Sequence, residues 1–435
     1  MSVIATESSR KREQDTTEYS QSNRGTRIIR IPISEEDYKI LISDRKIFIT
    51  RLSYYVDKYP ELFPSDWYSM SYGVHDYRIS KKLSTTHVIV RSGKDRSILY
   101  DIQPNYIMPY MSGYAKDVAF GLLLILYGVP YWLVAYGLGR DAMYWYRIFT
   151  HLGHFNLLGT TIRDATKLPK DIGIDEKISY WHQQEIYACM TVGGNCILGM
   201  GVAQKEDESS LSKAYGIFKT QAQRLITDYQ PISISSDGWA ATKKAISGLF
   251  NKSIIVLCFL HSVIKIRQVA QKEPEKKTLF DKVWQIYYAT DALSFDAAIL
   301  DLEQWAVKNV VKESVKERIL KIGKRKEEFK TAFQVPSAMR TTNMVDRLMK
   351  PLDRFLFMKQ YFHGDFQKVQ LAMNAFALCL NFAPFCPRTL DKNKQSEKHN
   401  FKSRAEVING KNFDDNWLLN LLSSASCNGL AFSTK

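Results

Sequence analysis

The chain has 435 residues, 45% of them hydrophobic, and this content excludes a disordered protein and allows two or three domains with ordinary cores. The formal net charge of +15 favours a polyanionic partner, either nucleic acid or an anionic membrane, over a protein that is merely basic. The six cysteines form no CxxC pair, so neither a zinc ribbon nor a disulfide framework is indicated, and a reducing cytoplasm fits best.

The first quarter of the chain is predicted to hold a tail and an accessory region. Residues 1–27 are polar and charged and lack the apolar core of a signal peptide, so we expect them to be disordered. Residues 28–63 have apolar side chains at helical spacing. The alternating segments 86–91 and 97–102 predict a β-hairpin joined by Ser-Gly-Lys-Asp. We expect residues 28–112 to be an accessory region that helps to hold DNA.

One segment raises the possibility of a membrane-anchored protein. Residues 118–139 carry no charge and are long enough for a transmembrane helix. Against this, Gly128-Val129-Pro130 breaks the segment in its middle. We therefore favour two short helices, 115–127 and 130–136, with Pro130 at the first helical position.

A third helix is predicted after the turn Gly137-Leu138-Gly139. It covers residues 140–149 and carries Arg140, Tyr144 and Arg147. Short helix, glycine-bearing turn and basic-aromatic helix is the order of a helix-turn-helix, so residues 113–160 are predicted to be a DNA-binding region of that kind.

The pattern becomes mixed α/β beyond a predicted linker, residues 160–174. The expected order is strand 185–192, strand 196–202, helix 209–227, a strand ending at Asp237, helix 239–250 and strand 253–260, after which His261 opens another helix. This order is compatible with a ribonuclease H-like core, built from residues 170–270 and 335–385.

Long charged helices are predicted between the two parts of this core. They cover residues 277–289 and 295–330, so residues 271–334 form a helical insertion. The charge-dense tract 312–330 is either a solvated helix face or a surface that contacts phosphates. Residues 386–435 are predicted to be a loop-like, basic tail with a short closing helix.

Three aspartates are candidates for metal-dependent phosphodiester chemistry, which needs carboxylates converging from separate parts of the chain to hold two divalent ions. Asp237 lies at a strand end, Asp175 precedes the opening strands, and Asp346 falls in the first turn of a helix that Asn343 can cap. Glu176 competes with Asp175. Oxygen ligands favour Mg²⁺ or Mn²⁺. Each aspartate alone also has an ordinary structural explanation, as a turn residue or as a first-turn acid that complements the helix dipole.

Cys258 and His261 stand three residues apart after the second candidate acid. A zinc site would need two further ligands, which no nearby spacing supplies. We therefore expect this pair to support the site by packing or hydrogen bonding.

Four segments carry a resemblance to a known family: 175–177 (DEK), 236–242 (SDGWAAT), 257–267 (LCFLHSVIKIR) and 342–349 (TNMVDRLM). With them the chain resembles bacterial insertion-sequence transposases of the DDE class, near the Mutator-like group. The core of that group carries a C-x-x-H element after the second aspartate and an all-helical insertion before the third acid. The third acid is usually glutamate, whereas the matching residue here is Asp346; Asp353 and Glu303 are the alternatives.

The resemblance implies an enzyme that cleaves transposon ends and joins the freed 3′-hydroxyls to target DNA, with Asp175, Asp237 and Asp346 as ligands of Mg²⁺ or Mn²⁺. Double-stranded DNA would contact five side chains: Arg140, Tyr144, Arg147, Lys265 and Arg267. Because two ends must be held together, we expect a homodimer or a larger assembly on DNA, in the cytoplasm and associated with the nucleoid. The alternative is an inactive or domesticated transposase that binds DNA without cleaving it.

Overall fold

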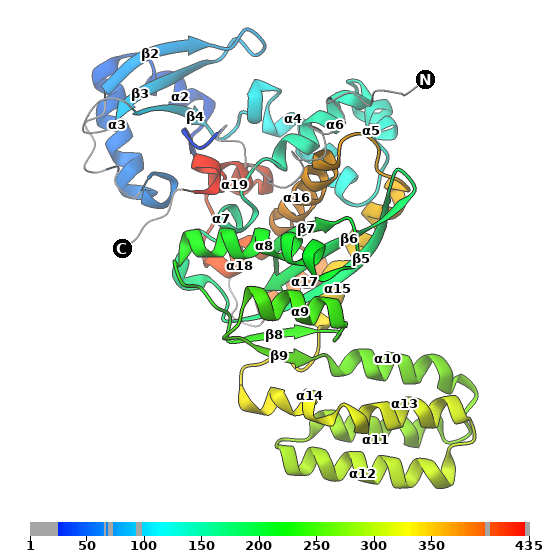
Figure 1. Ribbon diagram of the computed structural model, residues 1–435. Helices are drawn as coiled ribbons and strands as arrows, with labels where there is room; N and C mark the ends of the chain where they lie inside the picture. The colour runs from blue at the N-terminus through cyan, green and yellow to red at the C-terminus, as the bar shows by residue number, and fades with distance from the viewer. Residues whose placement is uncertain (1–24, 65–66, 68–72, 93–97, 396–400, 431–435) are drawn as a thin grey trace, which may run out of the picture.

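The computed structural model describes residues 25–64, 67, 73–92, 98–395 and 401–430 (Figure 1). Nearly all of the predicted disordered tail, and the turn of the predicted hairpin, lie outside these residues. The described part is mixed α/β, with two sheets and helices around them.

The N-terminal region is a four-stranded sheet covered by two helices. Its elements are β1 (Ile28–Ile31), α2 (Glu35–Leu41), α3 (Arg45–Lys58), β2 (Gly73–Ile79), β3 (Thr86–Ser92) and β4 (Ile98–Pro104). The strand order is β1-β4-β3-β2, with β1 parallel to β4 and the other pairs antiparallel. The hairpin of β3 and β4 confirms the sequence prediction. The helical interpretation of residues 28–63 was wrong at its start, because the first residues pair with β4, and Asp44 caps a separate helix.

The central sheet has five strands: β5 (Asp171–Trp181), β6 (Gln184–Gly193), β7 (Cys196–Ala203), β8 (Ser233–Ser236) and β9 (Ile254–Leu257). Their order is β7-β6-β5-β8-β9; β5, β6 and β7 are antiparallel, whereas β8 and β9 run parallel to β5. The predicted linker 160–174 was wrong at its end, because β5 begins at Asp171. Asp175 therefore lies inside the first strand of this sheet.

Helices cover both faces of the central sheet (Figure 1). One face carries α8 (Glu208–Leu225) and α9 (Ala240–Leu249). On the other face α15 (Asn343–Lys359) and α16 (Phe366–Phe382) contact the strands. The same core includes α4 (Ala115–Leu126), α6 (Ala142–Leu152) and α19 (Trp417–Ser424), which pack against α16. Alternating residues of β6 serve the two cores, since Ala188 and Met190 belong to this core and Cys189 belongs to the core with α8.

The predicted helix-turn-helix is not a separate unit. Helices α4 and α6 form, with α5 (Tyr131–Leu138) between them, and Pro130 precedes α5 instead of being its first residue. The buried Trp145 and Phe149 belong to the same core as the central sheet. The boundary at residue 160 was therefore wrong, because the apolar face of α6 packs on α16. Within the described chain, no helix is long and apolar enough to cross a membrane, since the uncharged segment breaks at Gly128.

The C-terminal residues were also expected to be a loop-like tail with one closing helix. The structure has α17 (Pro387–Gln395), α18 (Arg404–Asn409) and α19, and α19 packs against α16, α4 and α7 (Leu157–Thr161). Trp417 and Leu418 are buried in the core of the central sheet. This segment therefore completes the core.

The insertion is a helical bundle that projects from the β9 edge of the sheet (Figure 1). It contains α10 (Phe259–Val269), α11 (Lys276–Tyr288), α12 (Ala292–Asn309), α13 (Glu313–Lys324) and α14 (Lys326–Lys330), with a hydrophobic core of its own. The helical prediction is confirmed. The start at residue 271 was wrong, because α10 already packs in the bundle, and the single helix expected over 295–330 is three helices.

Gly201 sets the distance between α8 and β7. A Cβ at this position would lie 2.2 Å from the carbonyl oxygen of Ala214. We therefore predict that Gly201→Ala lowers the free energy of unfolding by about 1–3 kcal/mol, because backbone must move to make room. Urea unfolding measures the change.

Gly248→Ala is the matched control, because Gly248 is an exposed residue of α9 and a Cβ there meets no atom within 4 Å. It should leave stability unchanged or raise it by about 0.5–1 kcal/mol through helix propensity. Equal stability of the two variants would contradict the packing argument.

Candidate metal centre

Three titratable side chains converge where β5, α10 and α15 meet. Asp175 lies in the middle of β5, His261 in the first turn of α10 and Asp346 in the first turn of α15. One ligand atom of each lies within 4.8 Å of those of the other two, and all three residues are partly buried. Residues far apart in the sequence thus form one compact group of two carboxylates and one imidazole.

Asp175 and Glu176 point to opposite faces of the sheet, as successive strand residues do. Asp175 pairs with Met190, which belongs to the core beneath α15. Glu176 faces α8 and α9, where its Oε1 accepts hydrogen bonds from the hydroxyls of Tyr215 at 2.7 Å and Thr242 at 2.6 Å. Glu176 is therefore a partly buried residue that links β5 to α8 and α9 behind the site, and Asp175 is the acid that faces α15.

Asp237 lies directly after β8, next to Asp175. The parallel register pairs Gly173 with Ser235. Asp237 is two residues beyond Ser235 and therefore lies alongside Asp175, which is two residues beyond Gly173. Its Oδ1 accepts the N–H of Trp239 at 2.9 Å, which closes a turn. Asp237 is outside the 4.8 Å group, but its charge acts on Asp175 and His261. Of the three predicted acids, the structure groups Asp175 with Asp346 and places Asp237 beside them.

The C-x-x-H element joins the start of the insertion to its end. Cys258 Sγ accepts the backbone N–H of Thr342 at 3.1 Å and lies 3.1 Å from the Thr342 hydroxyl. The N–H of Phe259 donates to the carbonyl oxygen of Arg340 at 3.1 Å. Thr342 is the residue that precedes α15, so Asn343 is not the cap expected from the sequence but the first helical residue. These contacts hold the helix that carries Asp346.

The pKa values of all three grouped side chains are raised, which favours the neutral form of the aspartates and the charged form of the histidine. Burial raises the pKa of Asp175 to about 6, although His261 partly offsets this, and burial also raises the pKa of Asp346. A hydrogen bond to Cys258 outweighs burial and raises the pKa of His261 to about 9. Burial opposes ionisation of Cys258, but its hydrogen bonds with His261 and Thr342 lower the pKa overall. Glu176, behind the sheet, has its pKa raised to about 7 by burial.

Two buried atoms of the group have no hydrogen-bond partner among the described residues. They are Nδ1 of His261 and Oδ2 of Asp346. Buried polar atoms ordinarily have a hydrogen-bond partner. These two atoms have none, and each has a lone pair that could bind a cation. Oxygen and nitrogen donors of this kind suit a divalent metal ion. The residues present therefore fit a metal centre.

The alternatives to Asp346 lie elsewhere. Asp353, farther along α15, pairs with Lys177 at 2.7 Å. Glu303 lies on α12 against Gly323 of the insertion. Of these three acids, Asp346 is therefore the one that lies with Asp175 and His261.

Two side chains near the site were not predicted from the sequence. His261 was expected only as support, whereas one of its ring nitrogens is inside the group. Arg325, at the end of α13, extends from the insertion to the carbonyl oxygen of Gly238 at 3.5 Å and pairs with Glu328. The spacing of Cys258 and His261 was a usable signal for the first. Nothing local in the sequence marks Arg325, because its contact depends on how the bundle packs.

The side chains expected to bind DNA occupy two places. Arg140 is exposed, and its guanidinium lies 5.5 Å from the ring centre of Tyr144; the exposed Arg147 is 3.9 Å from Asp141. Lys265 and Arg267 are exposed on α10 of the insertion. The structure thus separates the two predicted groups, one beside α6 and one on α10.

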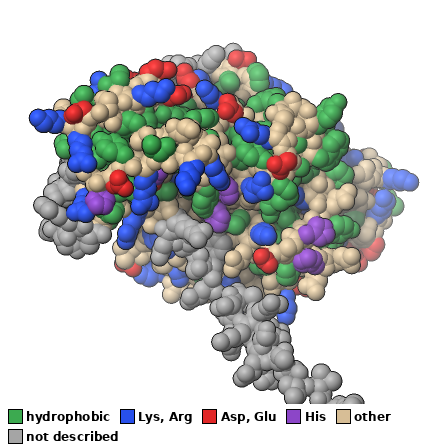
Figure 2. Space-filling view, turned by 90° about the horizontal axis from the view of Figure 1, so that it is seen from above, with side chains coloured by type: hydrophobic (Ala, Val, Ile, Leu, Met, Phe, Trp, Pro, Cys, Tyr) green, Lys and Arg blue, Asp and Glu red, His purple; other side chains and the backbone are tan. Residues whose placement is uncertain are grey.

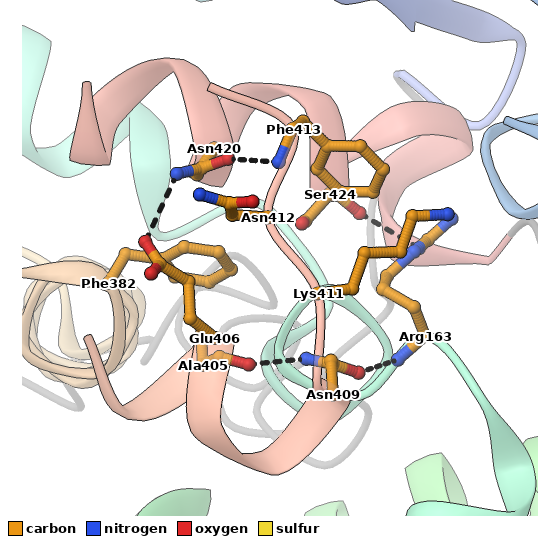
Figure 3. Close-up of a pocket in the computed structure, with 10 residues that line it drawn as sticks. All are labelled: Arg163, Phe382, Ala405, Glu406, Asn409, Lys411, Asn412, Phe413, Asn420 and Ser424. Carbon is orange, nitrogen blue, oxygen red and sulfur yellow. Dashed lines mark hydrogen bonds between the residues drawn. The ribbon is translucent and has the colours of Figure 1, made fainter. Parts of the chain in front are cut away.

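A small cavity near α18 and α19 lies apart from these residues (Figure 3). It is lined by Arg163, Phe382, Ala405, Glu406, Asn409, Lys411, Asn412, Phe413, Asn420 and Ser424. Its polar side chains hydrogen-bond to other residues of the lining: Asn409 accepts the backbone N–H of Arg163 and donates to the carbonyl oxygen of Ala405. A volume of about 20 Å³ holds a single water molecule, so this cavity belongs to the packing of the C-terminal segment.

Comparison with known proteins adds no assignment. No family model matches the chain, and no curated protein matches it.

Asp175 gives a test of the site that involves neither metal nor DNA. Because its folded-state pKa is raised from 3.8 to about 6, the folded protein binds this proton more tightly than the unfolded chain does, and stability falls as pH rises between about 4 and 6. Above pH 6 the buried charge is a cost. We predict that Asp175→Asn raises the free energy of unfolding at pH 7.5 by roughly 1–3 kcal/mol in metal-free buffer, with no gain at pH 4.

Urea unfolding with chelator at both pH values measures this difference. The exposed Asp228→Asn is the matched control and should change stability at neither pH. A variant at Asp175 that is less stable than the natural protein at pH 7.5 would contradict the burial of a charged carboxylate there.

Proposed function

We propose that this protein is a metal-dependent DNA transposase of the DDE class. The observation that carries the proposal is the convergence of Asp175, from the central strand, with Asp346, from a helix that returns after the insertion. These are the first and third acids that the family resemblance predicts. Asp237, the second, ends the neighbouring parallel strand beside them.

We further propose that the central sheet and its helices are a ribonuclease H-like core. Three antiparallel strands followed by two parallel ones, in the order β7-β6-β5-β8-β9, support this assignment. So does the chain order of acid, acid, helical bundle and acid. The bundle enters after β9 and leaves before α15, which is where the resemblance places an insertion.

The residues of the site divide the chemical work. Asp175 and Asp346 would hold one divalent ion, and Asp175 with the free carboxylate oxygen of Asp237 would hold another, because Trp239 occupies only Oδ1. Mg²⁺ or Mn²⁺ bound there supplies Lewis-acid activation of the attacking oxygen and stabilises the leaving oxygen. The chain itself orients these carboxylates and screens them from solvent by burial.

Exposed basic residues support DNA as the partner. The net charge of +15 favours a polyanion, and Arg140, Arg147, Lys265 and Arg267 are all exposed. Figure 2 looks down on the face formed by the N-terminal sheet and α4–α6, where Lys and Arg side chains are spread among hydrophobic ones. Duplex ends of the element, held by two or more copies of the protein in the cytoplasm, are the proposed substrate.

A second candidate is an inactive transposase-derived DNA-binding protein. Two observations favour it: the third acid is Asp346 where the family usually has glutamate, and Asp237 lies outside the 4.8 Å group. Cleavage activity separates the two candidates.

Asp237→Asn tests the catalytic proposal. The substitution removes a metal-holding charge at almost constant volume, so we predict a loss of Mg²⁺-dependent cleavage of at least about 100-fold while binding to the same DNA is retained. The substrate is duplex DNA that carries the sequences flanking the gene. Asp228→Asn should cleave like the natural protein, and undiminished cleavage by Asp237→Asn would remove Asp237 from the site.

Lys265 and Arg267 test the proposed DNA surface. Each phosphate contact contributes about 0.9 to the slope of log affinity against log salt concentration. Changing both residues to Gln should therefore reduce this slope by roughly 2, measured by fluorescence anisotropy with duplex DNA. The control changes the exposed Lys205 and Lys213 to Gln. Equal slopes for the two double variants would exclude α10 from the interface.

A further inference from the structure

His261 stands where a ligand of the metal centre would stand. One of its ring nitrogens lies within 4.8 Å of a carboxylate oxygen of both Asp175 and Asp346. Its Nδ1 is buried and has no hydrogen-bond partner in the described part of the chain, and the same holds for Oδ2 of Asp346. A buried nitrogen without a partner is uncommon, because buried polar atoms are ordinarily hydrogen-bonded.

The donor set has a chemical consequence. Mg²⁺ is a hard ion that favours carboxylate oxygens and retains several water molecules. Imidazole nitrogen suits first-row transition metals, and two carboxylates with one imidazole also suit Mn²⁺. We propose that His261 is a direct ligand of the ion held by Asp175 and Asp346, and that this position binds Mn²⁺ more tightly than Mg²⁺. The inference rests on the proposed function and specifies the metal of that site.

The surroundings of His261 hold the ring in place. A ligating histidine ordinarily uses its other ring nitrogen for an outer hydrogen bond that fixes its orientation. Cys258, the neighbour that raises the pKa of the imidazole, is itself held in place, since its Sγ receives the backbone N–H of Thr342 at 3.1 Å. Phe259 and Val263, on either side in α10, are buried in the core of the bundle. The imidazole is thus carried on a rigid helix start that is also tied to α15.

An ion pair of a protonated His261 with the two aspartates would bring the same groups together without any metal. The two arrangements differ in one observable. A nitrogen bound directly to Mn²⁺ couples magnetically to the ion, whereas a protonated imidazole does not bind it.

The test is electron spin-echo modulation spectroscopy of the full-length protein with Mn²⁺ and no DNA. We expect ¹⁴N modulation from one bound imidazole in the natural protein and its loss in His261→Gln. Binding titrations should give at least about 10-fold weaker Mn²⁺ affinity for this variant and little change in Mg²⁺ affinity. His75→Gln is the matched control and should keep both the modulation and the Mn²⁺ affinity, because His75 is an exposed histidine of β2 in the N-terminal sheet.

Bound Mn²⁺ without ¹⁴N modulation in the natural protein would overturn the inference, and so would a failure to bind Mn²⁺ or an unchanged affinity in His261→Gln. The spectrum of the natural protein decides the matter even if the variant does not fold. Because no DNA is present, a protein that shows the modulation but cleaves no DNA would contradict the proposed function and leave the metal ligand in place.

Discussion

The candidate site depends on the return of α15 to β5 after the helical insertion. Gly173 permits this approach, since a Cβ there would lie 2.7 Å from Val345 of α15. The hydrogen bond from Thr342 to Cys258 fixes the start of the helix against the start of α10. A metal centre tolerates displacements of only about 0.5 Å in its ligands, so the position of Asp346 requires such anchors on rigid elements. The C-x-x-H element therefore holds the starts of α10 and α15 together through Cys258, and it also contributes His261 to the group.

The same convergence makes the metal-free site electrostatically unfavourable. Two partly buried carboxylates have raised pKa values, and the charge of His261 only partly offsets their burial. Functional sites commonly keep such charges although they lower stability, and packing in the rest of the fold compensates for the loss. Here the compensation comes from a well-packed sheet, in which Ile172 and Ile174 of β5 are fully buried beside the acid. A bound cation would relieve the cost.

Local sequence patterns predicted the elements on either side of Asp237 well. Alternation and turn residues gave the strand before Asp237 and helix α9 close to their actual ends. The strand expected over 253–260 was wrong at its end, because β9 ends at Leu257 and α10 begins at Phe259, before His261. Strand β5 was missed because Asp171, Asp175, Glu176 and Lys177 interrupt its apolar pattern, and only pairing with β6 and β8 makes it a strand. The position of His261 was only partly predictable. Its spacing from Cys258 marked it as a candidate, but the residues beside it, Asp175 and Asp346, come from distant segments.

Anomalous diffraction from crystals soaked in Mn²⁺ measures directly whether these segments build one metal centre. We expect a manganese peak in contact with Asp175, Asp346 and His261, with Asp237 adjacent to it. A map with no peak among these side chains, or with manganese only at other acidic positions, would show that they do not form a metal centre.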